Sequence, residues 1–164
     1  MNAMRSFAQQ SLLWIGSLCG IGRLPASGTV AVAVVGVPLF MLTRGLSAWN
    51  YSFLLIAVTG ASVWIHDVGD RILGEKDSRK LVWDEIVGFL IAVAGLPFTW
   101  PLAAFAFVIE RAIDIAKVPP ARQIEKHWPG GWGVVGDDVV AGLYTCVILH
   151  LMIRIAPQLA FGSP

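Results

Sequence analysis

Residues 80–101 read KLVWDEIVGFLIAVAGLPFTWP, and this stretch decides how the rest of the chain is interpreted. It opens a run of 24 uncharged residues, 86–109, which two prolines within 97–101 interrupt near the middle. Proline inside a helix removes a backbone hydrogen bond and clashes with the preceding turn, so one straight helix is disfavoured. The sequence instead predicts two apolar helices, about residues 80–96 and 101–117, that meet at this turn. Such a hairpin puts the charged outer ends of both helices on the same side.

The composition is that of a membrane protein. Hydrophobic residues make up 56% of the 164 residues and charged residues only 14%, with a mean hydropathy of +0.70. Soluble domains usually carry about 45–50% apolar and about 25% charged residues. The length suits a single domain, residues 1–164. With a net charge of +1 and no basic cluster interleaved with aromatic residues, nucleic-acid binding is not expected.

Two further stretches are long enough to cross a bilayer. Residues 24–43 contain 20 uncharged residues and residues 45–66 contain 22, each close to the length that spans about 30 Å of hydrocarbon. A last apolar helix is predicted at about residues 137–156. Together with the proline-turn hairpin, these segments predict an all-α fold, a polytopic membrane helical bundle.

The charges predict the orientation of this bundle. All eleven acidic residues and ten of the twelve basic residues fall in three segments: the N-terminus up to Arg23, residues 67–85 and residues 110–138. The other two basic residues are Arg44 and Arg154. Because cytoplasmic loops are enriched in Lys and Arg, we expect the three charged segments to share the cytoplasmic side. The hairpin allows this, and it makes a polar site that faces the cytoplasm.

Two acidic pairs, Asp84–Glu85 and Asp137–Asp138, stand where apolar helices are expected to begin. Helix capping and the helix dipole offer an ordinary explanation for either pair alone. Two such pairs at the same interface are harder to explain in that way, because carboxylates at a membrane are costly unless they are paired, coordinated or functional. Clustered carboxylate oxygens suit Mg²⁺, which is the cofactor that we expect.

Two glycine-containing stretches raise a weaker possibility of ligand contact. PGGWGVVGDDVVAGL, residues 129–143, is interpreted either as an ordinary loop or as a backbone that approaches a ligand at a helix entrance. In RLPASGTVAV, residues 23–32, Thr29 is interpreted as a helix cap or as a phosphate contact. His66 and His127 show no metal-ligand spacing, and we expect them at the interface without a catalytic role.

Several motifs in order resemble the phosphatidylglycerophosphatase A family. They are LVWDEIVGFLIAVAGLP, ERAIDIAKVPPARQIEK and GGWGVVGDDVVAGL, preceded by LPASGTVAVAV, and the likeness covers about residues 20–145. The resemblance implies an all-helical, Mg²⁺-dependent phosphatase of the bacterial inner (cytoplasmic) membrane. Such an enzyme hydrolyses the terminal phosphomonoester of the lipid phosphatidylglycerophosphate to give phosphatidylglycerol and phosphate. One departure is Glu110, where the family commonly has an aromatic residue.

The resemblance, combined with the chemistry of the side chains, assigns roles to particular residues. The expected metal ligands are Asp84, Glu85, Asp114, Asp137 and Asp138. The expected catalytic residues are Asp84, Glu85, Asp138 and Lys117, with one carboxylate as general base. The expected phosphate-binding residues are Arg111, Lys117, Lys126 and Thr29. Attack by water and attack by an aspartate that forms an aspartyl-phosphate both remain open.

Three alternatives remain beside this function. Another membrane-lipid phosphohydrolase would use the same kind of metal site. A non-catalytic paralogue that binds lipid or a cation would keep the hydrophobic helices, although retention of all the motif acids argues against it. A transporter or channel would need carboxylates throughout the bilayer depth, whereas these gather at one face.

Overall fold

The computed structural model describes residues 2–161, and they form helices connected by short turns, without a strand among them. The helices are α1 (Asn2–Gly16), α2 (Ser27–Ala31), α3 (Val37–Thr43), α4 (Ala48–Leu73), α5 (Trp83–Ala92), α6 (Trp100–Ala116), α7 (Ala121–His127), α8 (Gly130–Ile155) and α9 (Gln158–Phe161). A 3₁₀ turn, Ile21–Arg23, precedes α2, and a π-helical segment, Val32–Gly36, joins α2 to α3. The all-α prediction is therefore confirmed.

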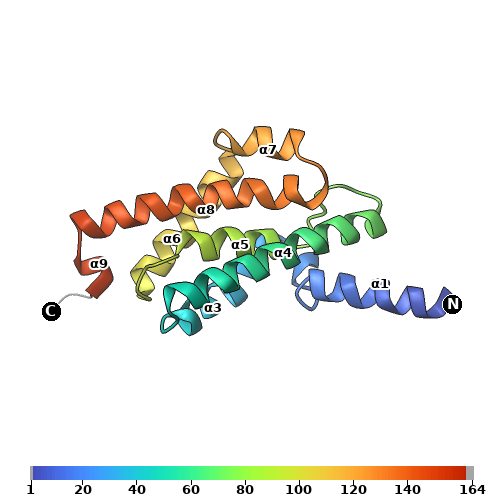
Figure 1. The fold of residues 1–164 in the computed structure, drawn as a ribbon, viewed down its shortest axis with the longest axis horizontal. Helices are drawn as coiled ribbons and strands as arrows, with labels where there is room; N and C mark the ends of the chain where they lie inside the picture. The colour runs from blue at the N-terminus through green and yellow to red at the C-terminus, as the bar shows by residue number, and fades with distance from the viewer. Residues whose placement is uncertain (1, 162–164) are drawn as a thin grey trace.

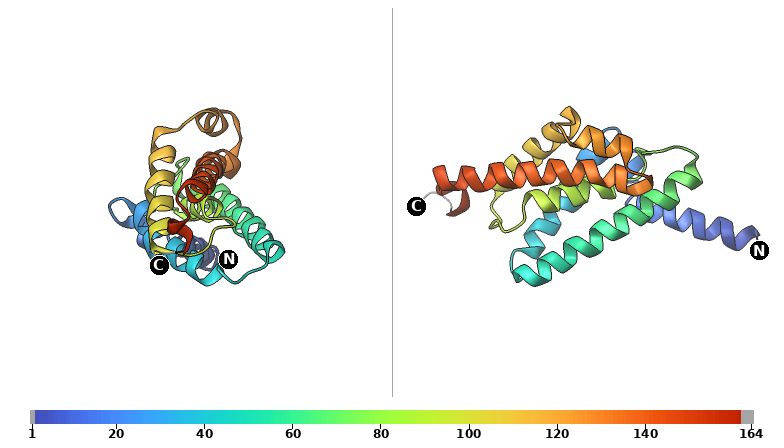
Figure 2. Two further views of the ribbon diagram at one scale, coloured as in Figure 1. Left: turned by 90° about the vertical axis from the view of Figure 1, so that its left-hand side faces the viewer. Right: turned by 45° about the horizontal axis from the view of Figure 1, so that its top comes forward.

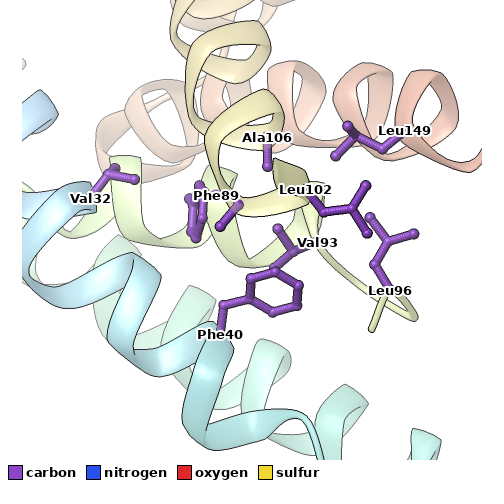
Figure 3. Close-up of a cluster of buried hydrophobic side chains, with 9 residues drawn as sticks. Val32, Phe40, Phe89, Val93, Leu96, Leu102, Ala106 and Leu149 are labelled. Atoms are coloured by element: carbon purple, nitrogen blue, oxygen red, sulfur yellow. The ribbon is translucent and has the colours of Figure 1, made fainter. Parts of the chain in front are cut away.

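Helix α5 lies at the centre of the molecule. It packs against α8, α4 and α6, which surround it in the view along the long axis (Figures 1 and 2). The main apolar cluster includes Phe89 of α5, Leu102 of α6 and Leu149 of α8 (Figure 3). Phe40 of α3 closes the cluster, with its ring centroid 6.4 Å from that of Phe89 in an edge-to-face arrangement. Helix α5, with seven of its ten residues buried, thus forms the centre of the core.

Small residues bring α5 and α8 close together. A Cβ atom added to Gly142 of α8 would collide with the carbonyl oxygen of Gly88 in α5. Close backbone approach through glycine is a common way to pack helices in membranes, where apolar surface alone does not drive association. This contact fixes how far α5 and α8 are shifted along each other, and so which of their residues lie opposite one another.

Helices α4 and α8 are long and apolar enough to cross a membrane. Each has 26 residues, or about 39 Å at about 1.5 Å per residue. Only 28% of an apolar 18-residue stretch in each helix is buried within the protein. Large apolar side chains cover their outer faces, including Phe53 and Ile56 on α4 and Val147 and Leu151 on α8. An apolar surface of this extent is typical of contact with lipid or another protein.

The break between α5 and α6 falls at the prolines. Helix α5 ends at Ala92 and α6 begins at Trp100, where the Thr99 hydroxyl accepts a hydrogen bond from the Leu102 N–H at 3.3 Å. Pro101 occupies the first turn of α6, where no helical hydrogen bond is lost. At ten residues, about 15 Å, α5 is shorter than the predicted helix 80–96 and too short to cross a bilayer alone.

The start of α8 was predicted wrongly. The sequence pattern favoured a loop up to residue 136, but the helix begins at Gly130. Glycine has a low helix propensity, yet tertiary contacts override it here because added side chains would collide with neighbouring backbone. A Cβ atom on Gly131 would strike the Val63 carbonyl oxygen of α4, and one on Gly133 would lie 2.6 Å from the Trp128 carbonyl oxygen. The glycines serve helix packing.

Candidate metal and phosphate site

A cavity of about 560 Å³ gathers most of the acidic residues singled out in the sequence. The start of α2, the turn before α5, the first turn of α5, the end of α6 and the first half of α8 contribute to its wall. Its ionisable lining consists of Asp77, Arg79, Asp84, Glu85, Arg111, Asp114, Lys117, Asp137 and Asp138. Six carboxylates against three basic side chains leave a formal excess of three negative charges.

Three aspartates form the tightest group. Asp137 and Asp138 lie two turns inside α8, both buried, and Asp114 reaches them from α6. One carboxylate oxygen from each of the three lies within 4.8 Å of the other two. The capping interpretation of Asp137 and Asp138 is therefore wrong, because the helix starts seven residues before them. Oxygen atoms at this spacing can share one cation.

Asp84 and Glu85 occupy the first turn of α5, on the wall of the same cavity. The N-cap residue of this helix is Val82, and no side chain caps it, so neither acid acts as the cap. Both still lie where the helix dipole favours negative charge. The Oδ1 atom of Asp84 and the Oε2 atom of Glu85 are buried without a hydrogen-bond partner. Buried, unpartnered carboxylate oxygens are expensive unless a cation satisfies them.

Arg111 is fixed by carboxylates on three sides. Its Nε and Nη2 atoms donate to Glu110 at 2.8 and 2.9 Å, and Nη2 also donates to Asp138 Oδ1 at 3.2 Å. Its Nη1 atom lies 3.4 Å from Asp114 Oδ2. Glu110 is completely buried, and its bidentate contact sets the plane of the guanidinium group. The remaining donors of Arg111 therefore face the three-aspartate group.

Lys117 provides the second cation of the site. Its Nζ atom lies 2.8 Å from Asp137 Oδ2 and 2.8 Å from Glu125 Oε2. Burial alone would lower the pKa of Lys117, but the hydrogen bonds to these two carboxylates outweigh it and raise the pKa above its usual value. Lys117 is therefore a stable positive charge at the edge of the aspartate group.

Asp77 also borders this cavity, from the turn before α5. Burial raises the pKa of Asp77, and the nearby Asp84 carboxylate raises it further. The turn is held by Asp70, whose carboxylate accepts hydrogen bonds from the N–H groups of Asp77 and Ser78 at 2.9 and 3.1 Å.

The donor set of the cavity fits a hard divalent cation. The described residues offer carboxylate oxygens from Asp84, Glu85, Asp114, Asp137 and Asp138, without a sulfur or imidazole group on the cavity wall. Mg²⁺ prefers such oxygens, together with water and phosphate oxygens. A bound cation would relieve both the negative excess and the unpartnered Oε2 atom of Glu85. The aspartate group is therefore a chemically suitable metal site.

Thr29 and Lys126, the other two predicted phosphate-binding residues, differ in their position relative to the cavity. Thr29 lies inside α2 as its third residue, not as its cap, and borders the cavity. Lys126 lies on α7 and does not border this cavity. It faces two other cavities that it shares with Arg122, because α7 turns this side chain outward. The predicted set is thus brought together except for Lys126.

Two residues, His66 and Glu110, lie beside the site but were not placed there by the sequence analysis. His66 of α4 is completely buried and its Nε2 atom lies 3.3 Å from Asp84 Oδ1, a contact that the sequence analysis did not predict. Its spacing of four residues from Asp70 in an apolar helix was the available signal. Glu110 directly follows 24 uncharged residues. A carboxylate at the end of such an apolar helix needs a charged partner, and the adjacent Arg111 provides it.

Comparison with known proteins gives the same family throughout most of the chain. The family model described as Phosphatidylglycerophosphatase A matches residues 14–153. Phosphatidylglycerophosphatase A of Escherichia coli K12 is 30% identical over 142 residues, covering 86% of this chain and 81% of that protein. The Haemophilus influenzae protein of the same name is 31% identical over 137 residues, covering 82% and 74%.

A third relative carries a different name. A Bacteroides thetaiotaomicron protein, provisionally named as a phosphatidylinositol-3-phosphatase, is 31% identical over 144 residues, covering 82% of this chain and 89% of that protein. No solved structure matches the chain. The extent of the family match and the two named relatives decide the assignment. The chain belongs to the phosphatidylglycerophosphatase A family.

Proposed function

We propose that this protein is a Mg²⁺-dependent lipid phosphatase that converts phosphatidylglycerophosphate and water to phosphatidylglycerol and phosphate. The observation that carries the proposal is one cavity that joins a three-aspartate group, two buried carboxylates with unpartnered oxygens and two fixed cations. The names of the Escherichia coli and Haemophilus influenzae relatives support the choice of substrate.

Five carboxylates would hold the metal: Asp84, Glu85, Asp114, Asp137 and Asp138. Bound Mg²⁺ supplies Lewis-acid stabilisation of the negative charge on the phosphoryl oxygens. Arg111 and Lys117 add N–H donors and positive charge for the same oxygens. Both are already oriented by carboxylates, so little reorganisation is required when the phosphate enters.

The reaction exchanges one P–O bond for another. A water oxygen bonds to phosphorus in line with the glycerol oxygen, whose bond to phosphorus breaks. A carboxylate of the group Asp84, Glu85 and Asp138 would accept one proton from the attacking water and return it to the glycerol oxygen, which leaves as an alcohol. In an aspartyl-phosphate route a carboxylate would displace the glycerol oxygen first, and water would then displace the carboxylate from phosphorus. One displacement inverts the configuration of a chirally labelled phosphorus and two displacements retain it, so the stereochemical outcome separates the two routes.

The membrane arrangement is part of the proposal. We infer a single domain in the bacterial inner membrane, a polytopic bundle whose α5–α6 hairpin keeps the acidic cavity at the cytoplasmic face. Support comes from the apolar outer faces of α4 and α8 and from the clustering of acidic residues around one cavity. A reporter fused after Lys80 should read as cytoplasmic, and a periplasmic reading would contradict this orientation.

A second lipid phosphomonoester is the alternative substrate. It is favoured by the Bacteroides relative, whose provisional name specifies phosphatidylinositol 3-phosphate and which is as similar as the other two. The same carboxylates and cations would serve, because both lipids present a phosphate monoester. The two candidate substrates therefore differ only in the headgroup that carries the phosphate.

The experiment that tests the function uses the full chain purified in detergent. Phosphate release is measured from phosphatidylglycerophosphate and from phosphatidylinositol 3-phosphate, each with Mg²⁺ and with EDTA. We expect release from the first lipid that requires Mg²⁺. Faster release from the second lipid would replace the substrate, and release that is equal in EDTA would contradict the metal dependence.

A further inference from the structure

His66 is an enclosed histidine between two carboxylates. Its side chain has no exposed surface, its Nε2 atom lies 3.3 Å from Asp84 Oδ1, and its Nδ1 atom lies 3.9 Å from Asp70 Oδ2. Among the described residues, no group offers either ring nitrogen or Asp84 Oδ1 a well-aligned hydrogen bond. The short distance makes the imidazole the nearest available donor for this oxygen.

The imidazole stands behind Asp84 and not in the catalytic cavity. His66 is absent from the wall of that cavity and borders a separate groove of about 350 Å³ with Asp67 and Asp70. It therefore cannot touch a phosphate bound beside Asp114 and Asp138. Asp84 is the residue of the cavity wall to which the His66 ring is directly opposed.

The other side of the imidazole faces a carboxylate whose position is fixed, that of Asp70. Asp70 lies one helical turn beyond His66 on α4 and accepts hydrogen bonds from the backbone of Asp77 and Ser78. These bonds tie the end of α4 to the turn that leads into α5. The His66 ring thus lies between Asp70 and Asp84, the first residue of the acidic pair in α5.

We propose that His66 is a positioning residue, which donates from Nε2 to Asp84 Oδ1 and thereby directs Oδ2 toward the metal. The proposal rests on the proposed function of the site. Groups that hydrogen-bond a ligating carboxylate fix its orientation, and their loss typically lowers metal affinity about 10- to 100-fold. His66 would therefore tune the affinity of the site without contacting the lipid.

Two substitutions separate the hydrogen bond from the packing. His66→Gln keeps an N–H donor close to the position of Nε2, whereas His66→Met fills a similar space without a donor. His127→Gln is the matched control, because His127 is exposed on α7 and its Nδ1 atom lies 2.8 Å from the Gln123 carbonyl oxygen, away from the acidic cavity. Far-UV circular dichroism and the thermal midpoint in detergent report whether each variant is folded.

Calorimetric titration of the full chain with Mg²⁺ supplies a measurement that does not depend on turnover. We expect about 10- to 100-fold weaker binding in His66→Met, and binding within about threefold of the parent in His66→Gln and His127→Gln. Equal binding in His66→Met and the parent would overturn the proposal. So would an equal loss in both His66 variants, because the role would then be one of packing.

Failure of the proposal can be distinguished from failure of the proposed function. Absence of Mg²⁺ binding by the parent contradicts the metal site itself, whereas normal binding by both parent and His66→Met contradicts only the role of His66. If His66→Met does not fold, ¹⁵N NMR of labelled histidine in the parent decides. A hydrogen on Nε2, with a resonance that moves in Asp84→Asn, supports the donor role, and an Nε2 without hydrogen overturns it.

Discussion

Arg111→Met should destabilise the protein, because it removes both hydrogen-bond partners of a buried carboxylate. Glu110 has no exposed surface, and its two oxygens accept bonds of 2.8 and 2.9 Å from Arg111. Removal of one partner of a buried ion pair costs about 3–5 kcal/mol. At about 1.4 kcal/mol per factor of ten, this cost raises the unfolding equilibrium constant about one hundred- to several thousand-fold.

The double variant Glu110→Leu/Arg111→Met separates stability from catalysis. The double variant removes the fully buried Glu110 charge together with its partner, so we expect it to regain much of the stability lost in Arg111→Met, although Asp138 still lacks its Arg111 donor. Phosphate release should still be lost, because the guanidinium donors near Asp114 and Asp138 are gone. A double-mutant cycle from denaturant unfolding in detergent, followed by circular dichroism, measures the coupling of the pair.

Two results would refute this reasoning. If Arg111→Met is as stable as the parent, the bidentate contact with Glu110 does not carry the buried charge. If the folded double variant releases phosphate at the rate of the parent, Arg111 takes no part in binding the phosphoryl group.

The remaining predictions concern the packing of α5 against α8 and which lysine side chain binds the phosphate. Gly142→Ala should destabilise the protein by about 1–3 kcal/mol because its methyl group collides with Gly88, whereas Gly60→Ala, with open space around it, should not; thermal unfolding compares them. Lys117→Met should lower kcat/KM for phosphate release about 10²- to 10³-fold, since a preorganised donor is lost. Lys126→Met should change kcat/KM less than about threefold. A loss as large as that of Lys117→Met would show that Lys126 does bind the phosphate.

The all-helical class and the grouping of the acidic residues could be predicted because they depend on local features. Hydrophobic run lengths, together with prolines 97 and 101, located the apolar helices and the break between α5 and α6. Charge distribution predicted that residues far apart in sequence share one end of the bundle, and Asp84, Asp114 and Asp138 do border one cavity.

Features that depend on packing between helices could not be predicted in the same way. The glycines after residue 129 favour a loop by propensity, and only the proximity of α4 and of Trp128 explains why they are helical. The position of His66 depends on the rotation of α4 about its axis relative to α5, which the sequence does not specify. The position of Lys126 could not be predicted either, because the direction that α7 takes after α6 decides which cavity its side chain borders.

The claim that the carboxylate cavity performs Mg²⁺-dependent phosphate release is tested most directly by a titration of initial rate against free Mg²⁺. The parent, Asp84→Asn, Asp138→Asn and the exposed control Glu75→Gln are compared with phosphatidylglycerophosphate as the substrate, after each is shown to be folded. We predict a saturable Mg²⁺ requirement in the parent and in Glu75→Gln, and a rate at least about 10²-fold lower in both aspartate variants. Rates for folded Asp84→Asn and Asp138→Asn equal to that of the parent would contradict the account.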